Sequence, residues 1–292
     1  MFKTLASSAL TAAALVTSAC ALPAIASAQS VNWTSEQGSR NGNRVHLTTN
    51  GNWPGRSHSN WSFDERSQGL AGVNFQAFAS GPVLFALLRD AGRLDCQGRV
   101  SSIRGAGNCA FTADAAFADY LASRGIARPD RRTSFDLTMS GANRALVEAL
   151  AASGSPTPTL NDLTALSIHG ASAGFVRSLA AAGYPSTPAS KLVAFRIHGV
   201  DAAYIRGLGE HNPRLRALRA DELIAMRIHG VTPAQVRELA RLGYGDLGSS
   251  DLVAMNIHGV TPAFITGLTR LGYRDLPASK LITLKMFGPM SR

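Results

Sequence analysis

The stretch Ile228–Pro233 (Ile-His-Gly-Val-Thr-Pro) indicates the fold of this chain, because its Ile-His-Gly part returns at regular intervals. The glycines of its four copies lie 29, 31 and 29 residues apart, and degraded copies lie one further 29-residue step beyond each end. Self-similarity at such a period is the signature of a repeat protein. The six registers end at Gly141, Gly170, Gly199, Gly230, Gly259 and Gly288.

Each unit predicts two short helices. The first, over residues 250–258, can be capped by Ser250 or Asp251, and Gly259 is expected to end it in the left-handed conformation. The second begins at Thr261-Pro262, an N-cap followed by a proline in the first turn, and ends at Gly272-Tyr273. The expected apolar stripes are Leu252, Met255 and Ile257 in the first helix and Phe264, Ile265, Leu268 and Leu271 in the second.

Helices this short are not stable alone, so each unit must bury its apolar face on its neighbours. The predicted outcome is a stack of helical hairpins, either an α-solenoid or a compact superhelix. Residues 115–125 predict a second helix without a first partner, which joins the stack to the preceding region. The two extra residues of the 31-residue spacing are expected on a loop at Glu210–Pro213.

The region before the repeats predicts a small antiparallel sheet. Period-2 alternation indicates strands at 44–47, 60–63 and 73–78, and residues 82–89 form a denser apolar strand. A turn at Asp90–Gly92 leads into a strand over 93–101, which returns along 104–111. The predicted fold class is therefore α+β, with an antiparallel β region at 29–112 followed by a helical hairpin array at 113–292.

Cys96 and Cys109 provide a check on this hairpin. If its turn centres on residues 102–103, facing residues have numbers that sum to 205, so the two cysteines lie opposite each other. Facing Cβ atoms are about 4.5–5.5 Å apart, close to the ~3.5–4.5 Å of a disulfide. We expect a cross-strand disulfide, and two buried thiols are the alternative. Gly105 and Gly107 in the return strand predict close backbone approach or a bulge.

The first 28 residues have the features of a secretory signal peptide. Lys3 gives a positive start, an apolar run follows, and Ala26–Ala28 is a small-residue cleavage site before Gln29. Lipidation at Cys20 is the less favoured alternative, because no aliphatic residue stands three places before it. No later run reaches about 18 consecutive apolar residues. The mature chain is therefore expected in the periplasm or secreted, without a transmembrane segment.

The Ile-His-Gly-Val-Thr-Pro-Ala unit, its Leu-Gly-Tyr ending and its Asp-Leu link resemble the C-terminal repeats of bacterial BlaR/MecR-type sensor peptidases. Leu87–Gly92 and Arg104–Gly107 resemble the β segment before those repeats, so the resemblance spans roughly residues 60–290. The chain has no His-Glu-x-x-His, and none of the peptidase's catalytic residues can be carried over. The resemblance implies a free-standing, exported form of the accessory module.

One histidine recurs in each of four units, at His169, His198, His229 and His258. A metal column or a pH sensor would use such a row. Helices pack about 8–10 Å apart, whereas zinc ligands lie ~2.0–2.1 Å from one ion, so these residues share a metal only in a tightly wound superhelix. We expect polar or cationic groups at helix C-termini instead, with no metal and no cofactor.

Arginine recurs in two registers, which a stacked array turns into rows. Together with the net charge of +10, the rows predict a basic surface for an anionic partner; solvated arginines that cover apolar surface are the alternative. Only four of the 29 basic residues are lysines, which favours bidentate contacts, although genomic base composition gives the same bias. The first row is Arg177, Arg206 and Arg237, with Thr266 in the fourth unit; the second is Arg196 and Arg227, with Ser167, Asn256 and Lys285 at the same register.

The chain has 292 residues and 45% of them are hydrophobic, which excludes wholesale disorder. The leading hypothesis is a non-catalytic exported module that binds a protein or an anionic envelope ligand through its repeats. The first alternative is a hydrolase with a site in the β region, although nothing brings His46, His58, Asp64 or Glu65 to a nucleophile. The second alternative is DNA binding through tandem helix-hairpin-helix units, in which backbone amides of the turn bind a phosphate. Pro233 removes one of these amide donors from the turn, and export would separate the protein from DNA.

Overall fold

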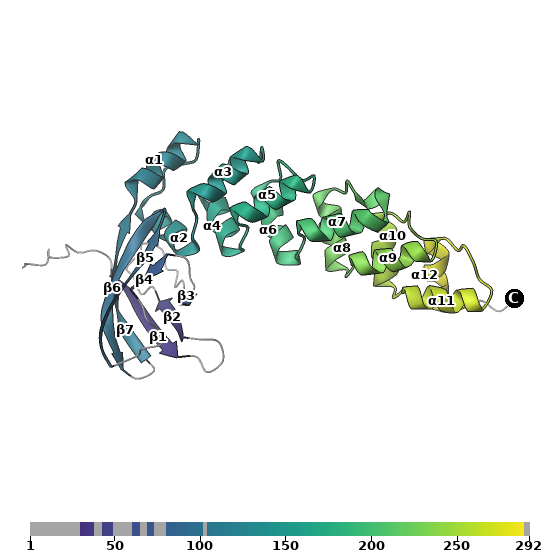
Figure 1. Ribbon diagram of the computed structural model, residues 1–292, viewed down its shortest axis with the longest axis horizontal. Helices are drawn as coiled ribbons and strands as arrows, with labels where there is room; N and C mark the ends of the chain where they lie inside the picture. The colour runs from purple at the N-terminus through teal and green to yellow at the C-terminus, as the bar shows by residue number, and fades with distance from the viewer. Residues whose placement is uncertain are drawn as a thin grey trace, which may run out of the picture.

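The structure is a computed structural model that describes residues 30–37, 43–48, 60–64, 69–72, 80–101 and 104–288. Within these ranges a seven-stranded sheet precedes twelve α-helices, which continue away from it as an elongated stack (Figure 1). The predicted α+β class is confirmed, and the chain passes from strand to helix between Ala113 and Ala115. The expected leader (1–28) and the expected strand at 73–78 lie outside the described residues.

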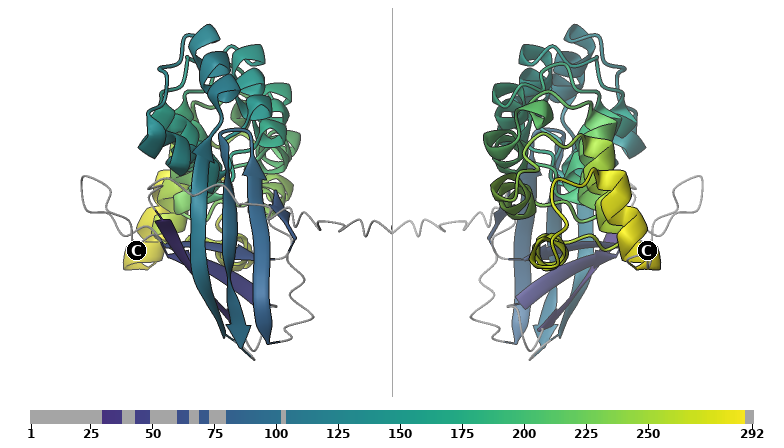
Figure 2. Two further views of the ribbon diagram at one scale, coloured as in Figure 1. Left: turned by 90° about the vertical axis from the view of Figure 1, so that its left-hand side faces the viewer. Right: turned by 90° about the vertical axis from the view of Figure 1, so that its right-hand side faces the viewer.

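The sheet has the order β3-β2-β1-β7-β6-β5-β4, and every neighbouring pair is antiparallel. Seen end on, its long strands stand below the first helices and the rest of the stack recedes behind them (Figure 2). The sequence did not predict β1, where only Val31 and Trp33 give an apolar alternation, or the two-residue β4. The strands are β1 (Ser30–Gln37), β2 (Asn43–Thr48), β3 (Asn60–Asp64), β4 (Leu70–Ala71), β5 (Gly81–Arg89), β6 (Gly92–Ser101) and β7 (Arg104–Ala113).

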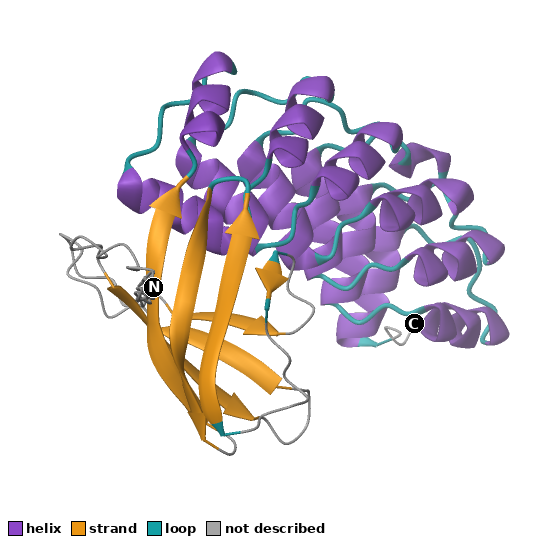
Figure 3. Cartoon of the chain, turned by 60° about the vertical axis from the view of Figure 1, so that its left-hand side comes forward, coloured by secondary structure: helices purple, strands orange, loops and turns teal. Residues whose placement is uncertain are grey.

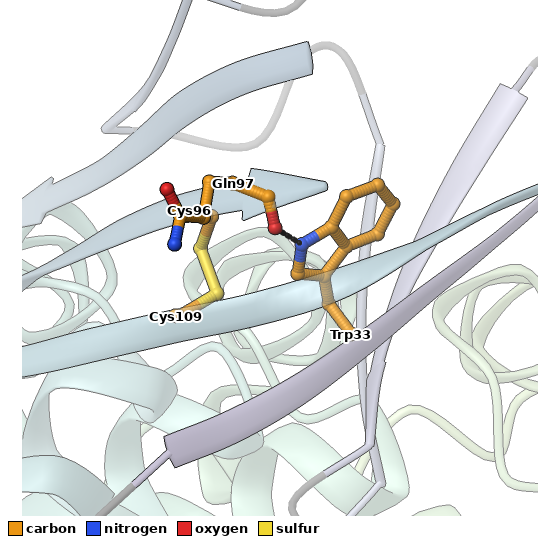
Figure 4. Close-up of a disulfide and its surroundings, with 4 residues drawn as sticks. All are labelled: Trp33, Cys96, Gln97 and Cys109. Carbon is orange, nitrogen blue, oxygen red and sulfur yellow. Dashed lines mark hydrogen bonds between the residues drawn. A yellow bond between two sulfur atoms is a disulfide. The ribbon is translucent and has the colours of Figure 1, made fainter. Parts of the chain in front are cut away.

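β6 and β7 pair in the predicted register, in which facing residue numbers sum to 205. Cys96 faces Cys109, and the two form the predicted cross-strand disulfide (Figure 4). Beside it, the indole N–H of Trp33 donates to the carbonyl of Gln97 at 3.0 Å. A Cβ at Gly107 would lie 2.0 Å from that carbonyl oxygen, which confirms the close backbone approach expected at this glycine.

The helices form two layers. Even-numbered helices follow one another in one layer, and α3 to α11 follow one another in the other (Figure 3). Each repeat contributes one helix to each layer, as the predicted hairpins require. The helices are α1 (Ala115–Ser123), α2 (Arg131–Ser140), α3 (Arg144–Ala152), α4 (Leu160–Ile168), α5 (Ala173–Ala181), α6 (Ala189–His198), α7 (Ala202–His211), α8 (Ala220–Ile228), α9 (Pro233–Arg241), α10 (Ser249–Ile257), α11 (Pro262–Arg270) and α12 (Ala278–Phe287).

Each even-numbered helix ends at its predicted glycine. The six glycines have φ values between +69° and +84°, the left-handed region that disfavours side chains. In the first five of these turns, the residue after the glycine donates its N–H to the carbonyl five positions earlier, for example Val231 to Met226 at 2.9 Å and Val260 to Met255 at 2.8 Å. Both residues of each pair are buried. This Schellman turn closes the helix end with a hydrogen bond and an apolar contact together.

The expected helix boundaries need two corrections. α10 begins at Ser249 after Gly248 as N-cap, so neither Ser250 nor Asp251 caps it. α7 continues through Glu210 and His211, and the extra residues are taken up by Asn212 and a 3-10 helix at Pro213–Leu215. The N-caps Thr232 and Thr261 accept hydrogen bonds from the third helical residue, as predicted.

The expected apolar stripes were wrong at two positions. Ile257 is 57% exposed and Leu271 is 72% exposed, although both were expected to pack. Ile257 follows the buried Met255 by two residues, which places it about 200° around the helix, on the opposite side. Leu271 is the C-cap of α11 and lies beyond its buried face.

We expect Gly230→Val to lower the free energy of unfolding by about 1–2 kcal/mol, because a side chain is strained at a φ of +73°. Gly267→Ala is the matched control. Gly267 lies inside α11, and an added Cβ would meet no atom within 4 Å, so this change should raise stability by up to about 1 kcal/mol. Thermal unfolding measures both, and an unchanged melting temperature for Gly230→Val would contradict the role of the turn.

Cys96→Ala combined with Cys109→Ala should lower the free energy of unfolding by about 2–4 kcal/mol, because the disulfide restricts the unfolded chain. In the chain that begins at Gln29, intact-mass analysis should find both thiols closed to alkylation until a reductant is added. Alkylation without reductant would show that the pair is free.

Candidate binding face on the helical array

Four isoleucines at one register form an exposed row on the even-numbered helices. Ile168, Ile197, Ile228 and Ile257 are 54, 56, 56 and 57% exposed, although isoleucine is among the residues most often buried. Each lies two residues before the turn glycine. Met286 holds the same place in α12 and is 52% exposed. We name these five residues the isoleucine row.

A second apolar position widens the row. Residues four apart on a helix lie on the same side, so the position four residues before each row member shares its face. Thr164 holds this position in α4, and from α6 onward it is aliphatic and partly buried against the core. We name the isoleucine row with these aliphatic residues the outer apolar face; the added residues are Val193, Ile224, Val253 and Ile282.

On α2 the same two registers are covered by the sheet. Phe135 and Met139 are each 2% exposed, because α2 packs on β6 and β7. The rings of Phe135 and Phe111 meet edge to face at 5.3 Å, and Met139 belongs to the core of the sheet. Figure 3 shows the sheet at one end of the array, with the later helices extending beyond it. The outer apolar face therefore continues an interface that exists within the chain.

The recurring histidines lie beside the isoleucine row. His169, His229 and His258 are the C-caps of their helices, and His198 is the last residue of α6. The four histidines therefore lie at helix C-termini, as expected. Among the residues that the structure describes, no group of three or more His, Cys, Asp or Glu could hold a metal ion.

Arg196 and Arg227 connect neighbouring repeats. Arg227 Nε donates to the carbonyl of Gly199 at 3.0 Å, and its guanidinium lies 4.7 Å from the centre of the Tyr204 ring. Arg196 makes the same pair of contacts at 3.3 and 5.1 Å, with His169 and Phe175. These arginines, proposed from sequence as a binding surface, thus cap the preceding turn.

Other side chains at this register act in the same way. Asn256 donates to the carbonyl of His229 at 2.9 Å, and the Lys285 ammonium lies 4.9 Å from the centre of the Phe264 ring. Burial raises the pKa of Tyr204 to about 12, and its hydroxyl donates to the carbonyl of Val231 at 3.1 Å. Tyr204 therefore stays neutral beside Arg227 and completes the contact between the repeats.

The other arginine row is free. Arg177, Arg206 and Arg237 lie on α5, α7 and α9 and are exposed, and none has a hydrogen bond or ion pair with another described residue. Their cationic heads are therefore available to an anionic partner. The array thus offers two candidate surfaces, the outer apolar face and this arginine row.

The β region contains a hollow of about 860 Å³ at the end of the β6–β7 hairpin. Ser35, Arg99 and Arg104 line it, and its described lining residues include no carboxylate or imidazole. His46 and Asp64 lie on the paired strands β2 and β3, whereas His58 and Glu65 lie outside the described residues. Of the four residues considered for a hydrolase from sequence, the described part of the chain therefore places only His46 and Asp64, on neighbouring strands.

In comparisons with known proteins, no family model and no curated protein matches this chain. No single helix in the described part of the chain is long and apolar enough to span a bilayer, although the bent pair α10 and α11 passes the same test on length and composition.

Arg227→Ala should lower the free energy of unfolding by about 1–2 kcal/mol, since it removes both a charge-assisted hydrogen bond and a ring contact between repeats. Arg237→Ala is the matched control on a free arginine, and we expect a change within about 0.5 kcal/mol. Thermal unfolding of the two variants provides the comparison. Equal effects would show that the contact of Arg227 does not stabilise the array.

Proposed function

We propose that this chain is a non-catalytic, exported binding module that takes a protein partner on its outer apolar face. The observation that carries the proposal is the isoleucine row, in which a large aliphatic side chain is more than half exposed in five successive repeats. A contiguous apolar surface of this kind is characteristic of protein interaction sites. The resemblance to the accessory repeats of sensor peptidases agrees with a role in the cell envelope.

Two features support export. The Cys96–Cys109 disulfide is a bond that persists in oxidising compartments, and the first 28 residues have the sequence of a cleavable leader. The face itself favours a protein over an anionic polymer. Its members are aliphatic, whereas a polyanion would be held by cations such as the free row of Arg177, Arg206 and Arg237.

Crosslinking in the native envelope fraction tests the proposal with two variants. Ile197→Gln/Ile228→Gln/Ile257→Gln alters the outer apolar face, and Arg177→Glu/Arg206→Glu/Arg237→Glu alters the free arginine row. Both sets are exposed, so both variants should keep the melting temperature of the parent chain. We expect the isoleucine variant to lose the crosslinked partner and the arginine variant to retain it.

If the arginine variant loses the partner and the isoleucine variant retains it, the binding site lies on the arginine row and an anionic ligand is favoured. A partner that both variants retain would place the site in the β region. No partner for the parent chain would contradict a protein-binding module and favour the hydrolase alternative.

A further inference from the structure

We propose that the outer apolar face holds an extended segment of the partner in the polyproline II conformation, with an aliphatic side chain at every third residue. This inference rests on the proposed function and adds the conformation and the side-chain period of the bound segment. It follows from the interface that the face continues, from the spacing of the repeats and from the hydrogen-bonding groups beside the row.

On α2, the registers of the outer apolar face are covered by β-strands, so extended chain can pack on these positions. On α2 its two registers pack on the strands β6 and β7. Arg89, at the end of β5, also donates to the carbonyls of Thr138 and Met139 at 2.9 and 2.7 Å. In later repeats, side chains of the next repeat instead donate to the turn carbonyls of His169, Gly199 and His229, which directly follow α4, α6 and α8. From α4 onward, the apolar positions that the sheet covers on α2 are exposed or only partly buried and are therefore available to a partner.

The distance between neighbouring repeats determines which spacing of side chains along a bound segment can match the isoleucine row. The even-numbered helices pack side by side, and packed helices lie about 8–10 Å apart. In polyproline II every third residue points the same way, and three residues advance ~9.3 Å. Same-face residues of a β-strand advance only ~6.6–6.8 Å, which loses register after one repeat. In an α-helix, residues seven apart advance ~10.5 Å, which exceeds the range.

The recurring histidines provide hydrogen-bond donors for the carbonyls of a polyproline II segment. A polyproline II segment forms no internal hydrogen bonds, so its carbonyls must be met by water or by donors of the receptor. His169, His198, His229 and His258 each directly follow a member of the isoleucine row. One imidazole N–H per repeat corresponds to one donor for every three ligand residues. The donor row and the apolar row thus have the same period.

Selection from a library of random, unconstrained peptides tests the proposal. Displayed peptides of about 15 residues, long enough at ~3.1 Å per residue to cross α4 to α12, are selected on the chain that begins at Gln29. We expect enriched sequences with an aliphatic residue at every third position and abundant proline between. Ile197→Gln/Ile228→Gln/Ile257→Gln should weaken an enriched peptide by about a hundredfold or more. His198→Ala/His229→Ala should weaken it by about tenfold.

Leu84→Gln is the control for general loss of surface hydrophobicity, since Leu84 is exposed on the outer side of β5 and away from the array. It should leave the affinity unchanged. Enriched peptides with a period of two residues or of three to four residues would overturn the proposal, and so would binding that survives the isoleucine substitutions. Failure to enrich any peptide would also overturn it.

The outcome is separable from that of the proposed function. If the isoleucine variant loses its crosslinked partner but no period-three peptide is enriched, the module binds through this face and the extended ligand is wrong. Sedimentation adds a further check. Self-association of the parent chain that the isoleucine variant loses would assign the face to a second copy and overturn the proposal.

Discussion

The array depends on the hydrogen bond that closes the turn after each of α2, α4, α6, α8 and α10, from the N–H after the glycine to the carbonyl five residues earlier. In the turn at Gly230 this bond joins Val231 to Met226, and both side chains are buried. Because the glycine has a positive φ, the chain reverses within three residues and starts the next helix at a fixed angle. Repeating this turn generates the two layers, and the layers determine which side chains reach the core.

Hydrogen bonds between repeats then align the layers, and they explain how the array absorbs its irregular spacing. The Tyr184 hydroxyl donates to the carbonyl of Leu218 in the next repeat at 2.7 Å. One repeat later, where the insertion removes the tyrosine, the buried Asn212 donates to the corresponding carbonyl of Leu247 at 2.7 Å. A shorter side chain on a longer loop thus makes the same link, so two extra residues leave the stack continuous.

The sequence predicted the features that follow from local chemistry. Glycine spacing located the end of each even-numbered helix, and the numbers of Cys96 and Cys109 predicted the hairpin register. It failed where tertiary geometry decides. The hydrogen bond from Arg227 to the carbonyl of Gly199 joins different repeats, so no local sequence pattern predicts it. Ile257 is a different kind of error: it was expected to pack because it is apolar, although its two-residue offset from Met255 already places it on the opposite side of the helix.

The isoleucine register carries a constraint that the fold does not explain. Other equivalent positions differ between the repeats. The register of Arg196 and Arg227, for example, holds Ser167, Arg196, Arg227, Asn256 and Lys285 in successive repeats. The exposed position nevertheless stays Ile in four repeats and Met in the next. A polar residue there would leave the turn bond, the caps and the core intact. Packing within the chain therefore does not select an aliphatic side chain at this position, whereas contact with an apolar partner would.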